Sequence, residues 1–100
     1  MATLYIAEYA ELAIVKNGQL IQAPLEPPLA SQAVAIAAGS AQSAAFNINT
    51  RFVRLFTDTA CGILFGTNPT ALTDRDRMAA NTVEYRAVPP GKSYKVAVIA

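Results

Sequence analysis

Short apolar stretches separated by polar breaks run along the whole chain. The clearest case is the segment 51–66, RFVRLFTDTACGILFG, in which two apolar runs flank the polar break Thr57, Asp58 and Thr59. Each run is too short for a helix and is rich in aromatic and β-branched residues, so the pattern predicts a strand, a tight turn and a second strand, forming a central hairpin. The expected core residues are Phe52 and Phe56, or their neighbours Val53 and Leu55, together with Ile63 and Phe65.

The first 22 residues predict three more strands, at about 3–8, 11–15 and 19–22. Asn17-Gly18 lies between two apolar runs, and this pair favours a type I′ turn because both residues tolerate positive φ. A helix over 3–15 remains an alternative, since Ala, Glu and Leu are good helix formers.

A proline-rich connector is expected at about 23–29, where Pro24, Pro27 and Pro28 prevent regular pairing. Such a segment crosses between sheets or reaches a neighbouring molecule. The alanine-rich stretch that follows favours strands with small side chains, although the composition of 31–47 also permits a helix.

Two alternating stretches close the chain, at 82–88 and 93–100. The second ends apolar, which is typical of a chain end docked in a sheet or against a partner. Seven or eight short strands with turn signals about every ten residues are typical of an all-β protein. We therefore expect one domain over 1–100, folded as a single antiparallel β-sandwich or a jelly-roll-like barrel.

Composition adds the expectation of an interface. Hydrophobic residues make up 53% of the chain and charged residues only 15%, which leaves little charge to coat a free surface. Seven of the eight basic residues lie in the second half. The candidate interface residues are Leu25, Leu29, Arg54, Arg75, Arg77, Arg86, Val98 and Ile99.

The residue inventory argues against catalysis. The chain has no histidine and one cysteine, Cys61, so histidine-based triads and cysteine zinc clusters are excluded. The acids of Asp74-Arg75-Asp76-Arg77 do not fit a calcium loop, because the arginines between them oppose a cation. We predict no catalytic, cofactor or metal site.

Membrane and nucleic-acid partners are not expected either. The start of the chain has no basic n-region and contains Glu8 and Glu11, which fits neither a signal peptide nor a membrane span, so synthesis in the cytoplasm is the default. Arg54 lies between Phe52 and Phe56, a mixture found in single-strand binders, but a sheet margin or an intersubunit ion pair explains this arginine better.

The second half also resembles a known class of proteins. The chain resembles small virion proteins of tailed bacteriophages in the run FVRLFTDTACGILFGTNPTA, which has a pattern of the type FxRxxxDxxCxIxFGxxPxA. Arg77-Met78-Ala79-Ala80, Glu84-Tyr85 and the closing PPGKSYKVAVI follow it and belong to the same resemblance. The resemblance covers about 51–99 and points to capsid decoration, or cement, proteins. It implies a non-enzymatic homotrimer on the capsid surface that binds the major capsid protein.

Two alternatives to the decoration role remain open. One is a tail or head-tail connector component. The other is a small β-sandwich module that binds carbohydrate or nucleic acid, which aromatic residues exposed in a groove would favour.

Overall fold

The computed structural model describes residues 2–74 and 76–100, and of residues 20–22 only the backbone. Within this part of the chain all regular structure is β, so the alternative of helices over 3–15 and 31–47 is wrong. There are more strands than expected, since β5 and β8 have only two residues each and are too short to show an alternating pattern. Their bounds are β1 Thr3–Tyr9, β2 Leu12–Ile14, β3 Leu20–Pro24, β4 Ala30–Ala35, β5 Ala41–Gln42, β6 Phe52–Thr57, β7 Cys61–Gly66, β8 Arg77–Met78, β9 Thr82–Ala87 and β10 Lys95–Ile99.

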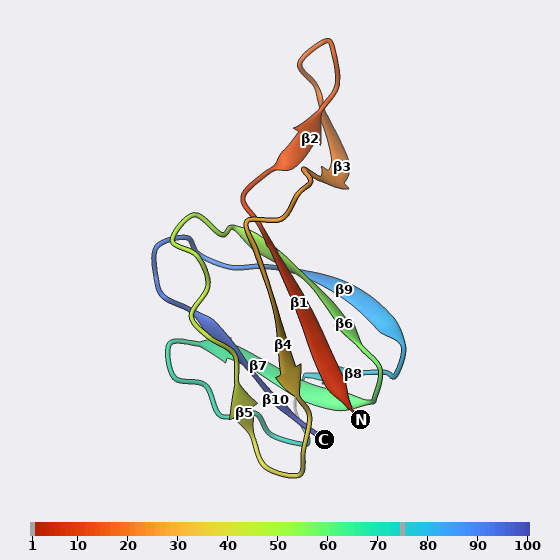
Figure 1. Ribbon diagram of the computed structural model, residues 1–100, viewed down its shortest axis with the longest axis vertical. Coiled ribbons are helices and arrows are strands. Elements are labelled where there is room, and N and C mark those ends of the chain that lie inside the picture. The colour runs from red at the N-terminus through yellow and green to blue at the C-terminus, as the bar shows by residue number, and fades with distance from the viewer. Residues whose placement is uncertain (1, 75) are drawn as a thin grey trace.

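Two four-stranded antiparallel sheets form the body of the protein (Figure 1). The first has the strand order β4-β1-β6-β9 and the second the order β5-β10-β7-β8. The strands β2 and β3 form a separate hairpin that projects beyond the end of the first sheet (Figure 1). The architecture is a β-sandwich with one protruding hairpin.

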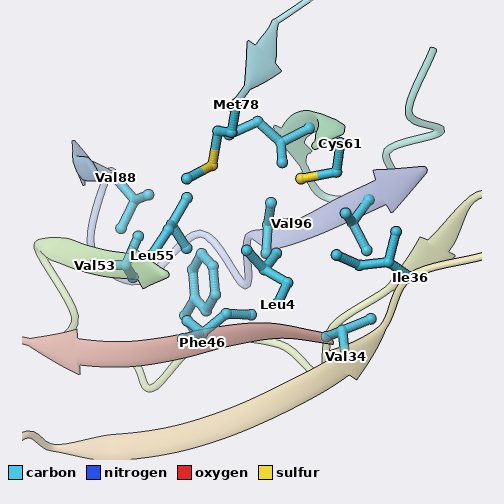
Figure 2. Close-up of a cluster of buried hydrophobic side chains, with 13 residues drawn as sticks. Leu4, Val34, Ile36, Phe46, Val53, Leu55, Cys61, Met78, Val88 and Val96 are labelled. Carbon is cyan, nitrogen blue, oxygen red and sulfur yellow. The ribbon is translucent and has the colours of Figure 1, made fainter. Parts of the chain in front are cut away.

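The core lies between the two sheets, and Figure 2 shows side chains from both converging on it. Alternation in β6 sends Val53 and Leu55 inward, which leaves Phe52 and Phe56 partly exposed on the other face. In β7 Ile63 is fully buried, whereas Phe65 packs against the edge of the core. The core cluster is Leu4, Ile6, Val34, Ile36, Phe46, Val53, Leu55, Cys61, Ile63, Met78, Val88, Val96 and Val98.

The expected central hairpin is wrong, because β6 and β7 lie in different sheets. The strand β6 pairs with β1 and β9, and β7 pairs with β10 and β8. The polar break crosses from one sheet to the other. Asp58 Oδ1 accepts a hydrogen bond from the Thr3 N–H at 2.8 Å, and the Thr59 N–H donates to Thr57 Oγ1. A tight polar break is compatible with a crossover as well as a hairpin, and only the distant partner strands decide between them.

The β2–β3 hairpin has a three-residue loop. The Gly18 N–H donates to the Val15 carbonyl at 2.8 Å, and the Val15 N–H donates to the Gln19 carbonyl at 2.8 Å. Positive φ occurs at Gly18 and not at Asn17. The expected type I′ turn is therefore wrong: this loop is the type I turn with a glycine bulge that three-residue hairpins use.

The proline-rich connector leads back along the end of β1. The Leu25 N–H donates to the Glu11 carbonyl at 3.1 Å, and the Leu29 N–H donates to the Glu8 carbonyl at 2.7 Å. The connector then enters β4, which pairs with β1 in the same sheet. The connector joins the two-stranded β2–β3 sheet to the first large sheet, so the expectation that it crosses between sheets is confirmed, although it does not connect the two large sheets.

The final strand, β10, lies inside the second sheet between β5 and β7. Docking of the apolar chain end in a sheet is confirmed. The side chain of Val98 is consequently 0% exposed, and the expectation that it lies at an interface is wrong.

Candidate interaction surface

The outer face of the first sheet carries an unusual concentration of aromatic side chains. The register sets Tyr5 opposite Phe56, which lies opposite Val83 on β9. All three side chains point away from the core, and Tyr5 and Val83 are more than 40% exposed. Large apolar side chains gathered on one open sheet face mark an interaction surface more often than isolated exposed ones. We call this surface the outer face; its residues are Tyr5, Ala7, Phe52, Arg54, Phe56, Val83 and Tyr85.

The aromatic rings on the outer face pack on one another. Phe52 stacks on Tyr9 with ring centroids 5.3 Å apart, and its ring lies 6.4 Å from that of Tyr85. Tyr5 and Phe56 form a second pair at 6.0 Å. Because each pair joins neighbouring strands, the rings hold one another in a preformed surface.

Arg54 is the cation at the middle of this face. It lies opposite Ala7 on β1 and opposite Tyr85 on β9, so it is flanked on both sides within the sheet. The expectation of a sheet margin is therefore wrong, since β6 is an inner strand. Among the described residues no carboxylate forms an ion pair with Arg54, which leaves its charge available to a partner.

Two shallow grooves of about 450 Å³ each border the outer face. One runs between the edge strand β4 and Arg54, with Tyr5 and Ala33 along it. The other lies where the hairpin meets the sheet, and its walls include Leu12, Phe52 and Tyr85. Exposed aromatics thus line grooves on both sides of the face.

The outer face of the second sheet is covered in part by the chain itself. Ala97, on the inner strand β10, is 0% exposed. A Cβ placed on Gly62 would lie 2.5 Å from the Leu72 carbonyl oxygen, so the segment after β7 passes directly over this sheet. The Ala71 N–H is held by Ser40 Oγ at 2.9 Å. The chain itself thus covers the second outer face around Gly62 and Ala97, while Leu64 on that face stays 40% exposed.

The hairpin and connector, residues 12–29, form an arm beside the outer face. Tyr9, at the end of β1, donates a hydrogen bond of 2.7 Å from its hydroxyl to Glu26 Oε2 and so fixes the arm to the sheet. Burial and this hydrogen bond raise the pKa of Tyr9 to about 12. Beyond this anchor, Ile14 is 59% exposed, and Leu25 and Leu29 are about half exposed.

The structure brings together only some of the predicted interface residues. Leu25 and Leu29 lie on the arm, and Arg54 lies on the outer face of the first sheet. Arg77 is exposed on β8, an edge strand of the other sheet, and Ile99 is half-buried there. Arg75 lies outside the described residues.

Arg86 is committed to an ion-pair network at the edge of the sandwich. Its guanidinium donates to Asp76 Oδ1 at 2.9 Å and to Glu84 Oε1 at 2.6 Å. The guanidinium holds the pKa of Asp76 below its usual range, and the Asp76 carboxylate raises the pKa of Arg86. Since Asp76 precedes β8 and Arg86 is on β9, the network joins the two sheets.

A buried polar cluster around Glu8 was not predicted. Glu8 is 2% exposed, and its Oε1 accepts hydrogen bonds from the Asn47 N–H at 2.7 Å and the Thr50 hydroxyl at 2.8 Å. Gln32 Nε2 donates to the other oxygen at 3.2 Å, and Gln32 Oε1 accepts from the Ala44 N–H. The cluster fixes the irregular segment 43–51 to the first sheet. The only sequence signal is that Glu8 has the inward parity of Leu4 and Ile6.

Cys61 is buried in the core beside Thr57. Burial raises the pKa of its thiol, which makes it a packing residue rather than a nucleophile. No group of acidic, cysteine or histidine side chains suited to a metal ion occurs among the described residues. None of these residues belongs to a helix long and apolar enough to cross a membrane.

Comparison with known proteins places the chain in no group: no family model, no curated protein and no solved structure matches it. The outer face and the arm are therefore the basis for any functional assignment.

Proposed function

We propose that this protein is a non-enzymatic structural protein that works by binding other protein surfaces, as a decoration or cement protein of a tailed-bacteriophage capsid. The observation that carries the proposal is the uncovered aromatic outer face. A monomeric protein seldom leaves large apolar side chains gathered on one open sheet face, whereas a protein contact buries them favourably.

The packing of the rings supports a protein partner over a small ligand. The rings of Tyr9 on β1 and Tyr85 on β9 already contact the Phe52 ring. A flat array of mutually packed rings around one arginine has the composition of a protein interface core, in which aromatics and arginine are enriched. The resemblance over 51–99 adds the class of partner, the major capsid protein on the virion surface.

A homotrimer is the assembly we propose. Closed cyclic symmetry buries apolar surface without open-ended growth. Light scattering on purified protein should give three times the 10.6 kDa chain mass. A monomer at every concentration would remove the trimer from the proposal.

The binding role is tested with assembled capsids of the phage whose genome carries the gene. The protein should cosediment with them, and Tyr5→Ser together with Tyr85→Ser should weaken binding at least tenfold. Lys92→Glu, on an exposed loop outside the outer face, is the matched control. Failure of the native protein to cosediment at any concentration would contradict the decoration role.

A ligand-binding module is the second candidate, favoured by the half-exposed Tyr5 and Tyr85 along the grooves. Tyrosine fluorescence titrated with a single-stranded oligonucleotide, and separately with an oligosaccharide, distinguishes it. Saturable quenching that Tyr85→Ser abolishes would favour the module over the structural role.

A further inference from the structure

The arm lacks the support that a two-stranded hairpin needs. The strands β2 and β3 pair only with each other, and an isolated hairpin is marginally stable in water unless a third strand or another surface covers one side. Ile14 is exposed on β2, and Val15 is exposed next to it at the start of the loop. Burial of these two apolar side chains against another surface would stabilise the arm.

The outer face of the same chain has the matching apolar character, but the arm cannot cover its own face. The arm extends past the end of β1 and β6 (Figure 1), along the longest dimension of the molecule, 48 Å. The arm meets the face at the end of β1, through the groove that Leu12 and Pro24 share with Phe52 and through the hydrogen bond between Tyr9 and Glu26. The loop end of the arm therefore needs a face on another molecule.

The base of the arm and the outer face carry charges of opposite sign, whereas the loop end of the arm carries Lys16. Glu11, exposed at the base of the arm, forms no ion pair within the described part of the chain. Arg54 is the unpaired cation at the centre of the outer face. When the arm of one copy packs on the outer face of another, apolar side chains meet apolar side chains and one carboxylate can pair with one guanidinium. A second copy of this chain is therefore a suitable partner for each surface.

We propose that the arm of one copy docks on the outer face of the next, with Glu11 facing Arg54. The contact is head to tail, because two different surfaces of the chain meet, and such contacts close into rings when the rotation allows it. This inference rests on the self-association in the proposed function and names the surfaces that produce it. The docked arm covers the outer face in the assembled ring, so Tyr5→Ser with Tyr85→Ser would weaken capsid binding by breaking the ring apart.

Reversal of the two charges tests the pairing. Sedimentation equilibrium of Glu11→Arg and of Arg54→Glu should each show self-association at least tenfold weaker than in the native protein, and the double variant should recover most of it. Lys92→Glu should associate like the native protein. A double variant no better than either single variant, or a native protein that stays monomeric, would overturn the arm-to-face contact.

Hydrogen exchange gives a second, mutation-free measurement. Protection of the amides of residues 13–19 should rise at least tenfold between dilute and concentrated native protein. Protection that is independent of concentration would overturn the proposal even if oligomers form. Oligomers that pass both tests but fail to cosediment with capsids would instead refute the decoration role alone.

Discussion

The hydroxyl of Thr50 donates a 2.8 Å hydrogen bond to Glu8 Oε1, although 42 residues separate the two in sequence. Both residues are at most 2% exposed. A buried carboxylate is costly unless donors surround it, and here the donors come from β4 and from the segment 43–51. The segment has no strand of its own at this point, so this cluster fixes its path.

Removal of the hydroxyl should measure that contribution. We expect Thr50→Val to lower the free energy of unfolding by about 1.5–3 kcal/mol, the range for hydrogen bonds to charged groups. Glu8→Ala should cost more, because it leaves several buried donors unpaired. Glu11→Ala, at the exposed base of the arm, should change the free energy of unfolding by no more than about 0.5 kcal/mol. Urea unfolding of the three variants is the measurement, and a neutral Thr50→Val would contradict a structural role for the cluster.

Two glycines in the described region should respond oppositely to alanine. A Cβ on Gly62 would lie 2.5 Å from the Leu72 carbonyl oxygen, a backbone atom, so Gly62→Ala should cost about 1–3 kcal/mol through overpacking. No atom lies within 4 Å of a Cβ on Gly39. There the substitution should be neutral or stabilise by up to about 1 kcal/mol, because it restricts the unfolded chain. Thermal melts of both variants test the pair; equal melting temperatures would refute the close approach.

Tyr9 should make stability sensitive to alkaline pH. Its folded pKa of about 12 exceeds the unfolded value of about 10, so its contribution is complete below pH 10 and is lost as the pH rises towards 12. Tyr9→Phe should lose less stability than the native protein across that window. Unfolding at several pH values between 9 and 12 checks this, and parallel curves for the two proteins would contradict the anchor.

Asp76 should make stability sensitive to acidic pH. The Arg86 guanidinium depresses the pKa of this carboxyl, so the stabilisation is complete above about pH 4, the unfolded value, and is lost as the pH falls through the folded value. Asp76→Asn should be less stable than the native protein at pH 7 and should show a smaller loss below pH 4. Because the pair is partly exposed, high salt should reduce the difference at pH 7.

Local pattern predicted much of the fold and little of its topology. The strands β1 and β6 follow the predicted alternation because each has one buried face whose period a sequence displays. The strands β9 and β10 also lie where alternation predicts strands, although β9 has no buried residue and Ala97 is buried on the outer side of β10. The same alternation did not reveal that β6 and β7 part into different sheets, since hairpins and crossovers have similar polar breaks. Val98 was misassigned for a related reason: the sequence shows that a strand is apolar, but not that two neighbours flank it.

The candidate surface was predicted only in pieces. Arg54, Leu25 and Leu29 were named from their polarity or their proline neighbours, but Tyr5 and Tyr85 were not. Those two tyrosines lie 80 residues apart in the chain and meet the face through pairings with β6. The sequence around either tyrosine gives no sign that the two share one sheet face.

The position of β10 between β5 and β7 has a consequence for synthesis on the ribosome. The strands β5 and β7 pair with β10 and not with each other. The second sheet therefore cannot be completed until residues 95–99 have left the exit tunnel. The first sheet also waits, because β1 must remain unpaired until β4 and then β6 emerge. Folding of this domain should therefore await the synthesis of residues 95–99, and the strand edges that stay exposed in the interval are where chaperones would bind.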